Sequence, residues 1–176
     1  MCWNSTKWNP KTATKDIVCY KVMRSFGEKF ISNIVGHVYE VNTLNTPRNL
    51  QQKVSYFLGS PWYEVSSGYF SYISIGKAAE NLVTDEVLVQ CTIPKGSIYC
   101  KASGEYVSSN IIINKRISAY KVFSGKSCRY FTDIHKASEY YLSLLQNFED
   151  ITDIWRYSNI CCIIGKTKSI GYIRYD

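Results

Sequence analysis

The sequence predicts an α+β protein in which a mostly antiparallel twisted sheet, or a pair of such sheets, carries two main helices. Aromatic residues are frequent among the 176, with fifteen Tyr, seven Phe and four Trp, and they suit half-buried pleated surfaces. Short apolar runs recur between turns that contain Gly or Pro, which is typical of strands. Only residues 75–83 and 135–148 show the apolar repeat of an amphipathic helix.

The first third begins with a polar arm, residues 1–16, that precedes the first strand. The run DIVCYKVMR at 16–24 alternates between two faces, and one face carries Ile17, Cys19, Lys21 and Met23. Shorter strands follow at FISNIV and HVYEVNT. Residues 42–62 contain Asn, Pro and Gly around a short helical pattern, and we interpret them as a long functional loop.

The middle third contains a strand that leads directly into a helix. The strand is GYFSYIS at 68–74, and Ser74 is a favourable N-cap for the helix that follows. The apolar residues of this helix repeat at helical spacing: Ile75, Ala78, Ala79 and Leu82. EVLVQCTI is the next strand, PKG closes it as a turn, and the strands SIYCKA and YVSSNIIINKRI flank a bend at SGE, 103–105.

The last third, residues 119–176, is predicted to form a small β-α-β-β unit packed on a β-rich core domain of residues 17–118. AYKVFSG is a strand, and either Thr132 or Asp133 caps the longest helix. The apolar stripe of this helix contains Ala137, Tyr141, Leu144, Leu145 and Phe148. The closing hairpin turns around GKTKSIG, which lacks the first glycine of a phosphate-binding G-x-x-x-x-G-K-[ST] loop.

The formal net charge of +7 is unevenly distributed along the chain. Residues 1–60 carry eight Lys or Arg against three Asp or Glu. This excess is compatible with attraction to a polyanion and, more simply, with a solvated basic surface. Nucleic-acid binding would use Trp3, Trp8 and Tyr20 for stacking, but the sequence has no recognition motif or dense basic stripe. We therefore do not expect nucleic acid as a partner.

The seven cysteines are expected to be buried free thiols of a reducing compartment. No C-x-x-C pair occurs, and only His37 and His135 could join cysteines in a zinc site, so we expect no metal. The sequence contains no apolar run of about 18 residues, and its N-terminus lacks an apolar signal core. We expect a soluble cytoplasmic protein that does not bind membranes.

Several motifs between residues 17 and 117 resemble, in their order, the ADP-ribosyltransferase superfamily. CYKVMR stands where the family has a strand carrying Arg or His. GYFSYIS, with AAENL behind it, stands where the family has the strand G-F-x-S-T-S and a helix. VLVQCTIPKG is similar to a third strand that ends in hydrophobic-P-x-G, and GEYVSSNIII opens at the corner where the family has G-x-x-E or E-x-E.

The resemblance implies a core of that fold with a cleft for NAD or another nucleotide. Arg24, or Lys21, would be the cation that clamps the pyrophosphate. Ser71, with Tyr72 beside it, would bind the nicotinamide-ribose side of the cofactor. Glu105 would be the catalytic carboxylate, which bonds the ribose 2′-OH and stabilises the positive charge that develops as nicotinamide leaves.

Three departures from the family pattern bear on catalysis. The motif S-T-S is S-Y-I-S here, and Tyr20 and Lys21 stand where the family often has a Tyr-Arg pair. Ser103 stands two residues before Glu105, so the pair that would activate a protein side-chain acceptor is missing. A degenerate copy of the fold that binds a nucleotide without turning it over fits these departures, and ADP-ribosyl transfer stays open as an activity.

Most of residues 1–117 also resembles small uncharacterised proteins encoded by gut Bacteroidales and their phages. This resemblance implies an accessory, host-interaction or counter-defence role in the cytoplasm of a host bacterial cell. The alternative function is therefore non-enzymatic: the protein would bind and block a host factor by surface contact. Aromatic interface anchors for such contact cluster around the long loop: Tyr56, Phe57, Trp62, Tyr63, Tyr69 and Tyr72.

Overall fold

The chain forms two compact units, Met1–Arg116 and Ile117–Asp176, and each is described here by itself. The computed structural model describes all residues except 1–2, 6–8, 28, 34–35, 46, 66, 84–85, 126, 147–150, 158–159, 166–168 and 176. It describes the backbone but not the side chains of residues 3–5, 57, 62, 151–157, 160–165, 169–170 and 175. The predicted α+β class is confirmed, because antiparallel sheets dominate and two helices accompany them.

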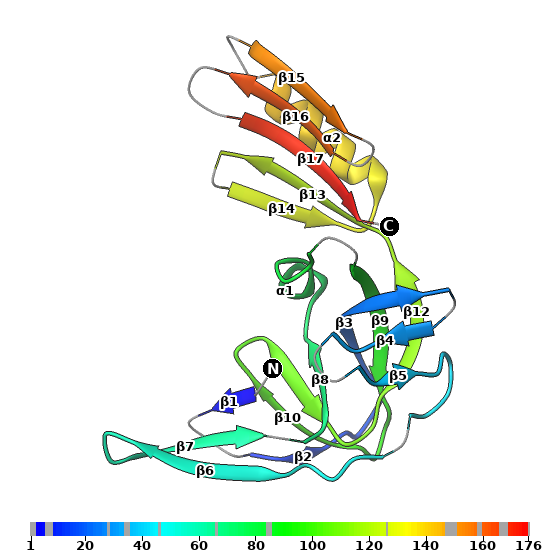
Figure 1. Ribbon diagram of the computed structural model, residues 1–176, viewed down its shortest axis with the longest axis vertical. Helices are drawn as coiled ribbons and strands as arrows, with labels where there is room; N and C mark the ends of the chain where they lie inside the picture. Colours follow the sequence, from blue (N-terminus) through cyan, green and yellow to red (C-terminus); the bar gives the residue numbers. More distant parts are fainter. Residues whose placement is uncertain are drawn as a thin grey trace. The chain divides into compact units, whose positions relative to one another are not determined.

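A large antiparallel sheet forms most of the N-terminal unit (Figure 1). Its strand order is β12-β9-β3-β8-β11-β10-β2, and a small extension pairs β4 with β3 and β5 with β4. The bounds of these strands are β2 (Lys11–Thr12), β3 (Ile17–Phe26), β4 (Lys29–Ile31), β5 (Val38–Tyr39), β8 (Tyr69–Tyr72), β9 (Glu86–Ile93), β10 (Ile98–Ala102), β11 (Glu105–Ser108) and β12 (Ile112–Ile117).

The central strand β3 has the alternation that the sequence predicts. Cys19 and Met23 have no exposed surface, and Lys21 between them is only 8% exposed. This face of β3 packs on the main core of the unit, which includes Tyr39, Tyr69, Val87, Val89, Cys91, Ile93, Ile111 and Ile113. The predicted alternation is therefore confirmed, and the buried face has the unusual feature that a lysine lies within it.

A second sheet of the N-terminal unit has the order β1-β7-β6. It comprises β1 (Trp3–Ser5), β6 (Gln52–Phe57) and β7 (Ser60–Val65), and the β6–β7 hairpin extends outward from the rest of the unit (Figure 1). Residues 1–16, expected to be a polar arm, thus supply the strands β1 and β2. The hairpin turns at Leu58 and Gly59, both with positive φ, and Leu58 is 90% exposed. The predicted long loop at 42–62 is therefore wrong in its second half.

The first half of that predicted loop is an irregular segment bound to the edge strand β12. Val41 and Leu44 form isolated bridges to Ile113 and Ile112. The backbone N–H of Arg48 donates to the carbonyl oxygen of Ser109 at 2.8 Å. These bonds hold the segment at the edge of the sheet and fix the backbone from which the Arg48 side chain extends.

Helix α1 (Ile75–Ala79) begins where the sequence predicts and ends earlier than the predicted 75–83. The hydroxyl of Ser74 accepts a hydrogen bond from the backbone N–H of Lys77 at 3.2 Å, so the predicted N-cap is confirmed. Ala78 and Ala79 are buried and pack the helix onto the unit.

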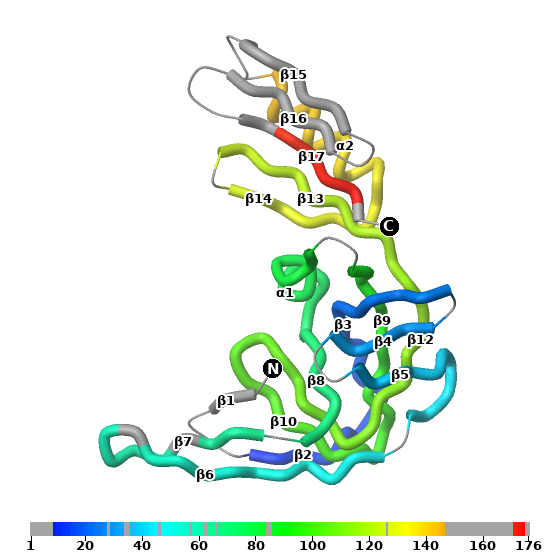
Figure 2. Tube along the Cα trace, viewed as in Figure 1, coloured from blue at the N-terminus to red at the C-terminus, as the bar shows by residue number. Residues whose placement is uncertain are grey.

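The C-terminal unit is one antiparallel sheet with a helix on one face (Figure 2). The strand order is β14-β13-β17-β16-β15, and the helix is α2 (Ile134–Leu145), capped by Asp133. Its strands are β13 (Ala119–Ser124), β14 (Ser127–Phe131), β15 (Ile151–Tyr157), β16 (Ile160–Gly165) and β17 (Ser169–Tyr175). The predicted β-α-β-β order therefore omits two strands, β14 and one of the three strands after the helix. Phe148, predicted to belong to the apolar stripe of the helix, lies outside the described residues.

Gly68, at the entry to β8, has a backbone conformation that side chains rarely adopt. Its φ is +131°, and a Cβ there would lie 2.6 Å from Leu50 Cδ2 and 2.7 Å from Val107 Cγ2. We expect Gly68→Ala to lower the free energy of unfolding by at least about 2 kcal/mol, from backbone strain and overpacking together.

Gly76, inside α1, provides the matched control for that measurement. No atom lies within 4 Å of a Cβ built there, and its φ is helical. Gly76→Ala should leave stability unchanged or raise it by about 0.5–1 kcal/mol because alanine favours helix. Chemical denaturation of both variants checks the pair, and equal effects would contradict the tight packing around Gly68.

The Ser74 cap allows a second stability prediction. Ser74→Ala should cost about 1 kcal/mol, because the N–H of Lys77 loses its side-chain acceptor. Ser74→Asp should retain most of the stability, since aspartate is an equally good N-cap. Denaturant titration of the three proteins measures this, and a loss in the Asp variant as large as in the Ala variant would exclude capping as the cause.

Candidate functional site

The sheet separates the residues that the sequence assigns to a nucleotide site. In the register of β8, Tyr72 lies opposite both Tyr20 and Glu105, while Ser71 lies opposite Tyr106. Successive side chains of a strand point to opposite faces, so Ser71 and Tyr72 lie on different sides of the sheet. We call these sides the Ser71 face and the Tyr72 face.

Arg24, Tyr72 and Glu105 belong to the Tyr72 face. Arg24 is four residues from Tyr20 on β3 and therefore on the same side, and Glu86 lies directly opposite it on β9. Lys21 is on the other side with Ser71. The structure thus groups Arg24 with Glu105 and Lys21 with Ser71, so Ser71, Arg24 and Glu105 do not line one cleft as expected. The individual binding and catalytic roles stay predictions.

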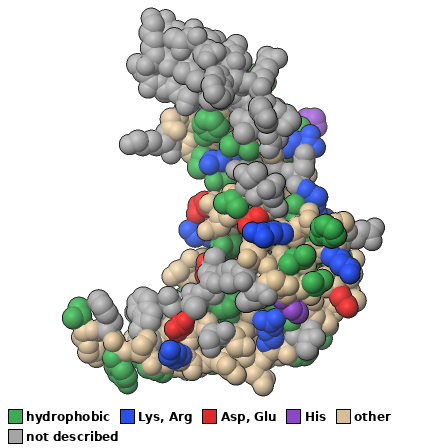
Figure 3. All heavy atoms as spheres, viewed as in Figure 1, with side chains coloured by type: hydrophobic (Ala, Val, Ile, Leu, Met, Phe, Trp, Pro, Cys, Tyr) green, Lys and Arg blue, Asp and Glu red, His purple; other side chains and the backbone are tan. Residues whose placement is uncertain are grey.

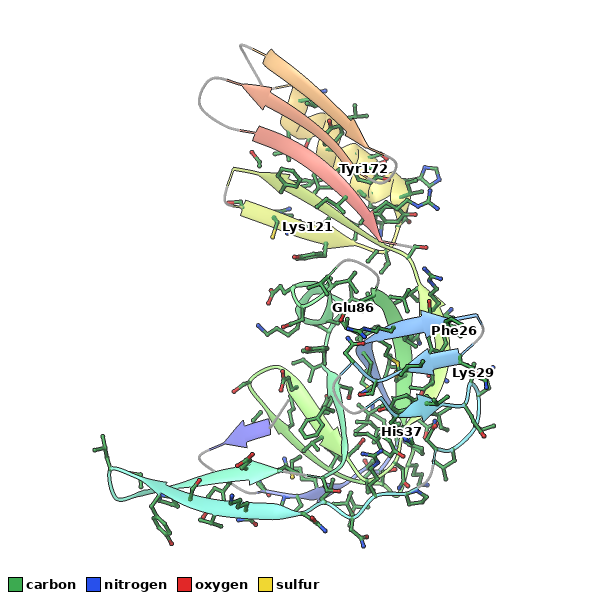
Figure 4. All side chains as sticks on the ribbon, viewed as in Figure 1. Phe26, Lys29, His37, Glu86, Lys121 and Tyr172 are labelled. Atoms are coloured by element: carbon green, nitrogen blue, oxygen red, sulfur yellow. The ribbon has the colours of Figure 1, made fainter. Side chains whose placement is uncertain are left out.

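The Tyr72 face carries a half-buried acidic group. Burial raises the pKa of Glu105, and the charge of Lys77 on α1 opposes that rise. Burial, together with the neighbouring carboxylates of Glu105 and Glu86, raises the pKa of Tyr72 to about 12. Glu86, labelled in Figure 4, accepts hydrogen bonds from the Asn33 amide and the backbone N–H of Val83. Burial and the neighbouring carboxylates thus disfavour the ionised forms of Tyr72 and Glu105 at this face.

The Ser71 face carries a buried cation. The ammonium of Lys21 donates a hydrogen bond to the carbonyl oxygen of Phe70 and lies 5.5 Å from the centroid of the Tyr39 ring. Among the described side chains, no carboxylate comes within ion-pair distance of it. A charged group taken out of water is costly unless it is paired, so a Lys21 held by one carbonyl and one ring is incompletely compensated.

A second cation reaches this face from the segment bound to β12. The guanidinium of Arg48 lies 4.8 Å from the centroid of the Tyr69 ring, and it opposes the rise that burial causes in the pKa of Tyr69. The rings of Tyr39 and Tyr69 are 5.9 Å apart, and the His37 ring meets Tyr39 edge-on at 4.7 Å. We call Lys21, His37, Tyr39, Arg48 and Tyr69 the cation cluster.

Among the described residues, two buried polar atoms at the Ser71 face have no hydrogen-bond partner: His37 Nε2, which belongs to the cation cluster, and Ser71 Oγ. Burial, and then the charges of Arg48 and Lys21, lower the pKa of His37, so its imidazole is neutral near pH 7. His37 is half-buried, and in Figure 3 a histidine adjoins a Lys or Arg side chain on the visible surface of the N-terminal unit. The cluster therefore combines two positive charges with unused hydrogen-bonding capacity close to the surface.

The sequence predicts a binding role for Lys21 in the cation cluster, and it indicates Tyr69 only as a surface aromatic. Lys21 is the alternative to Arg24 for the same role, and the structure places the two on opposite faces. Arg48 lies in the stretch predicted to be a functional loop, but the Asn, Pro and Gly pattern of that stretch does not single out this residue. Tyr39 lies in the short strand β5 and His37 directly precedes it, and the sequence there carries no comparable signal.

The expected surface aromatics differ widely in exposure. Tyr69 and Tyr72 are buried, at 1% and 7% exposed, while Tyr56 on the hairpin is 75% exposed. Tyr63 is half-buried. The side chains of Phe57 and Trp62 lie outside the described residues, as do those of the stacking candidates Trp3 and Trp8. Tyr69 and Tyr72 therefore fill the core and cannot anchor an interface.

Glu105→Gln tests the acidic group of the Tyr72 face. Because burial raises the pKa of Glu105, the folded state holds its proton more tightly than the unfolded state. The contribution of this carboxyl group to the stability of the folded protein is therefore lost as the pH rises above its ordinary pKa of 4.5 toward the raised value. At pH 7 the glutamine variant should be as stable as the parent or slightly more stable. At pH 3 its stability relative to the parent should be lower. Denaturation at both pH values decides this, and a destabilised variant at pH 7 would indicate a favourable buried charge.

Comparisons with known proteins give no relative for this chain: no family model, no curated protein and no solved structure matches it. The described side chains include no group of three or more His, Cys, Asp or Glu that could hold a metal ion. Of the helices that the structure describes, none has the length and apolar character required to cross a membrane.

Proposed function

We propose that the N-terminal unit binds a small phosphate-bearing ligand of the nucleotide class at the cation cluster, without catalysing ADP-ribosyl transfer. The observation that carries this proposal is Lys21, which is 8% exposed and has no carboxylate partner among the described residues. Arg48 adds a second positive charge on the same face, again beside an aromatic ring.

An anionic ligand would supply what the cluster lacks. Phosphate oxygens accept charge-assisted hydrogen bonds from ammonium and guanidinium groups, and these bonds are stronger than neutral ones. A protonated His37 would add a further donor, because the negative charge of a ligand favours the imidazolium form. The shared chemistry of NAD, ADP-ribose and cyclic nucleotides is the phosphate group, so each is a reasonable first ligand.

Binding without transfer follows from the position of Glu105. The family resemblance requires a carboxylate in the same cleft as the serine and the cation that hold the cofactor. Glu105 is on the Tyr72 face, whereas Ser71 and Lys21 are on the opposite one. Sequestering a nucleotide rather than turning it over would suit the accessory or counter-defence role that the resemblance to phage-encoded proteins implies.

Calorimetry with NAD, ADP-ribose and cyclic nucleotides tests the proposal. Lys21→Met keeps the length of the side chain and removes its charge, so it should weaken binding at least tenfold, or about 1.4 kcal/mol. Lys53→Met, on exposed β6, is the matched control and should bind like the parent. Absence of heat with all of these ligands, or equal losses in both variants, would overturn the proposal.

The two histidines of the chain allow an independent test by NMR. His37 should titrate below its ordinary pKa of 6.5, because burial and the charges of Arg48 and Lys21 disfavour its protonated form. A saturating anionic ligand should raise this pKa, since it partly neutralises the two cations. The imidazole signals are assigned with His135→Gln. An unchanged His37 titration with a ligand that binds by calorimetry would place that ligand elsewhere.

The exposed tip of the β6–β7 hairpin supports a second candidate function, the binding of a host protein by surface contact. Leu58 has φ +49°, a conformation that favours Gly or Asn, and its apolar side chain is 90% exposed. Leu58→Asn should preserve or improve stability, because asparagine suits this turn. The same change should abolish capture of a host protein, measured with the purified partner after its identification by mass spectrometry. Undiminished binding by the Asn variant would rule out the tip.

A further inference from the structure

Cys19 and Cys91 lie directly opposite each other on the antiparallel strands β3 and β9. Neither has any exposed surface, and both belong to the main core of the N-terminal unit. Both are free thiols, and the thiol of Cys91 donates a hydrogen bond to the carbonyl oxygen of Val89 at 3.7 Å. The longest strand pairing of this unit thus holds the two thiols at directly opposite positions.

The spacing of such a pair matches the requirement of a disulfide. Residues directly opposite on antiparallel strands have Cα atoms about 4.5–5.5 Å apart. Disulfides bridge Cα atoms about 4.4–6.8 Å apart. The bond can therefore form between β3 and β9 without separating the strands.

The two sulfurs have unequal environments. Hydrogen bonding from Cys91, followed by the Ser71 hydroxyl and the charge of Lys21, lowers the pKa of Cys19 against the opposing effect of burial. Burial raises the pKa of Cys91 well above its ordinary value. Cys19 shares β3 with Lys21 and lies beside β8, which carries Ser71, whereas Cys91 lies on β9 at the other side of β3. We therefore assign the thiolate, which is the reactive form, to Cys19.

We propose that Cys19 and Cys91 are a peroxide-reactive dithiol, in which Cys19 is the attacking sulfur and Cys91 the resolving one. The Cys19 thiolate attacks one oxygen of hydrogen peroxide, which forms an S–O bond, breaks the O–O bond and releases hydroxide that is protonated to water. The Cys91 sulfur then attacks the Cys19 sulfenic acid, so the S–S bond forms, the S–O bond breaks and a second water leaves. Two thiols lose two electrons and two protons, and one peroxide is reduced to two waters.

Ser71 lies next to the reacting sulfur. Its Oγ is buried and makes no hydrogen bond within the described part of the chain. Its hydroxyl also lowers the pKa of the Cys19 thiol. It offers a polar contact for a small peroxide molecule at the reacting sulfur. Because neither sulfur is exposed, we expect oxidation to require local opening and to be selective for small oxidants.

Peptide mapping of the intact protein tests the proposal without any nucleotide, so its outcome is independent of the proposed function. After hydrogen peroxide treatment and alkylation of the remaining thiols, trypsin should release residues 16–21 linked to residues 78–95. Cys100 is the matched buried control, because burial raises its pKa to about 11 and it lies opposite Val107 instead of a cysteine. We expect its oxidation to be at least about tenfold slower.

Single variants identify the attacking sulfur. In Cys91→Ser, a dimedone probe should label the sulfenic acid of Cys19. In Cys19→Ser, labelling of Cys91 should be at least about tenfold weaker. Absence of the linked peptides in the parent protein overturns the dithiol, whether or not the variants fold. Equal labelling of the two cysteines overturns the assigned order of attack.

Discussion

The pairing of β3 with β9 is the interaction on which the N-terminal unit depends. It runs without a break from Ile17 opposite Ile93 to Arg24 opposite Glu86. On its other side β3 pairs with β8 and β4, so the strand joins three neighbours. One face of β3 enters the main core, and this same face carries Lys21 and Cys19. A polar function built here is therefore held by the longest strand pairing of the unit.

This position carries a thermodynamic cost that an apolar residue would avoid. A lysine at the centre of a core face loses water, and one carbonyl oxygen and one ring recover only part of that hydration energy. Replacement of buried charges by apolar groups is often neutral or stabilising in other proteins. This cost supports the ligand recognition that we propose for Lys21. Arg48, on the same face, lies 4.8 Å from the centroid of the Tyr69 ring.

Local signals in the sequence predicted the parts of the fold that local forces determine. The alternation along β3 and the caps Ser74 and Asp133 depend on residues adjacent in the chain, and the structure contains all three. The hairpin at 52–65 was missed because its turn is Leu58-Gly59, which lacks the Asn-Gly signal of such turns. The separation of Ser71 from Glu105, and the arrival of Arg48 over Tyr69, depend on strand neighbours that no local pattern specifies.

The two ends of the β6–β7 hairpin differ in how firmly they are packed. Its root is held by Val65, which is fully buried, whereas the side chains near its tip are exposed. Opening the tip disrupts only the ladder between its own two strands, and the core around β3 keeps its packing. Backbone amides near the tip should therefore exchange their hydrogens with solvent long before those of β3 and β9. The hairpin can thus change its conformation to suit a contacting surface while the interior of the sheet remains closed.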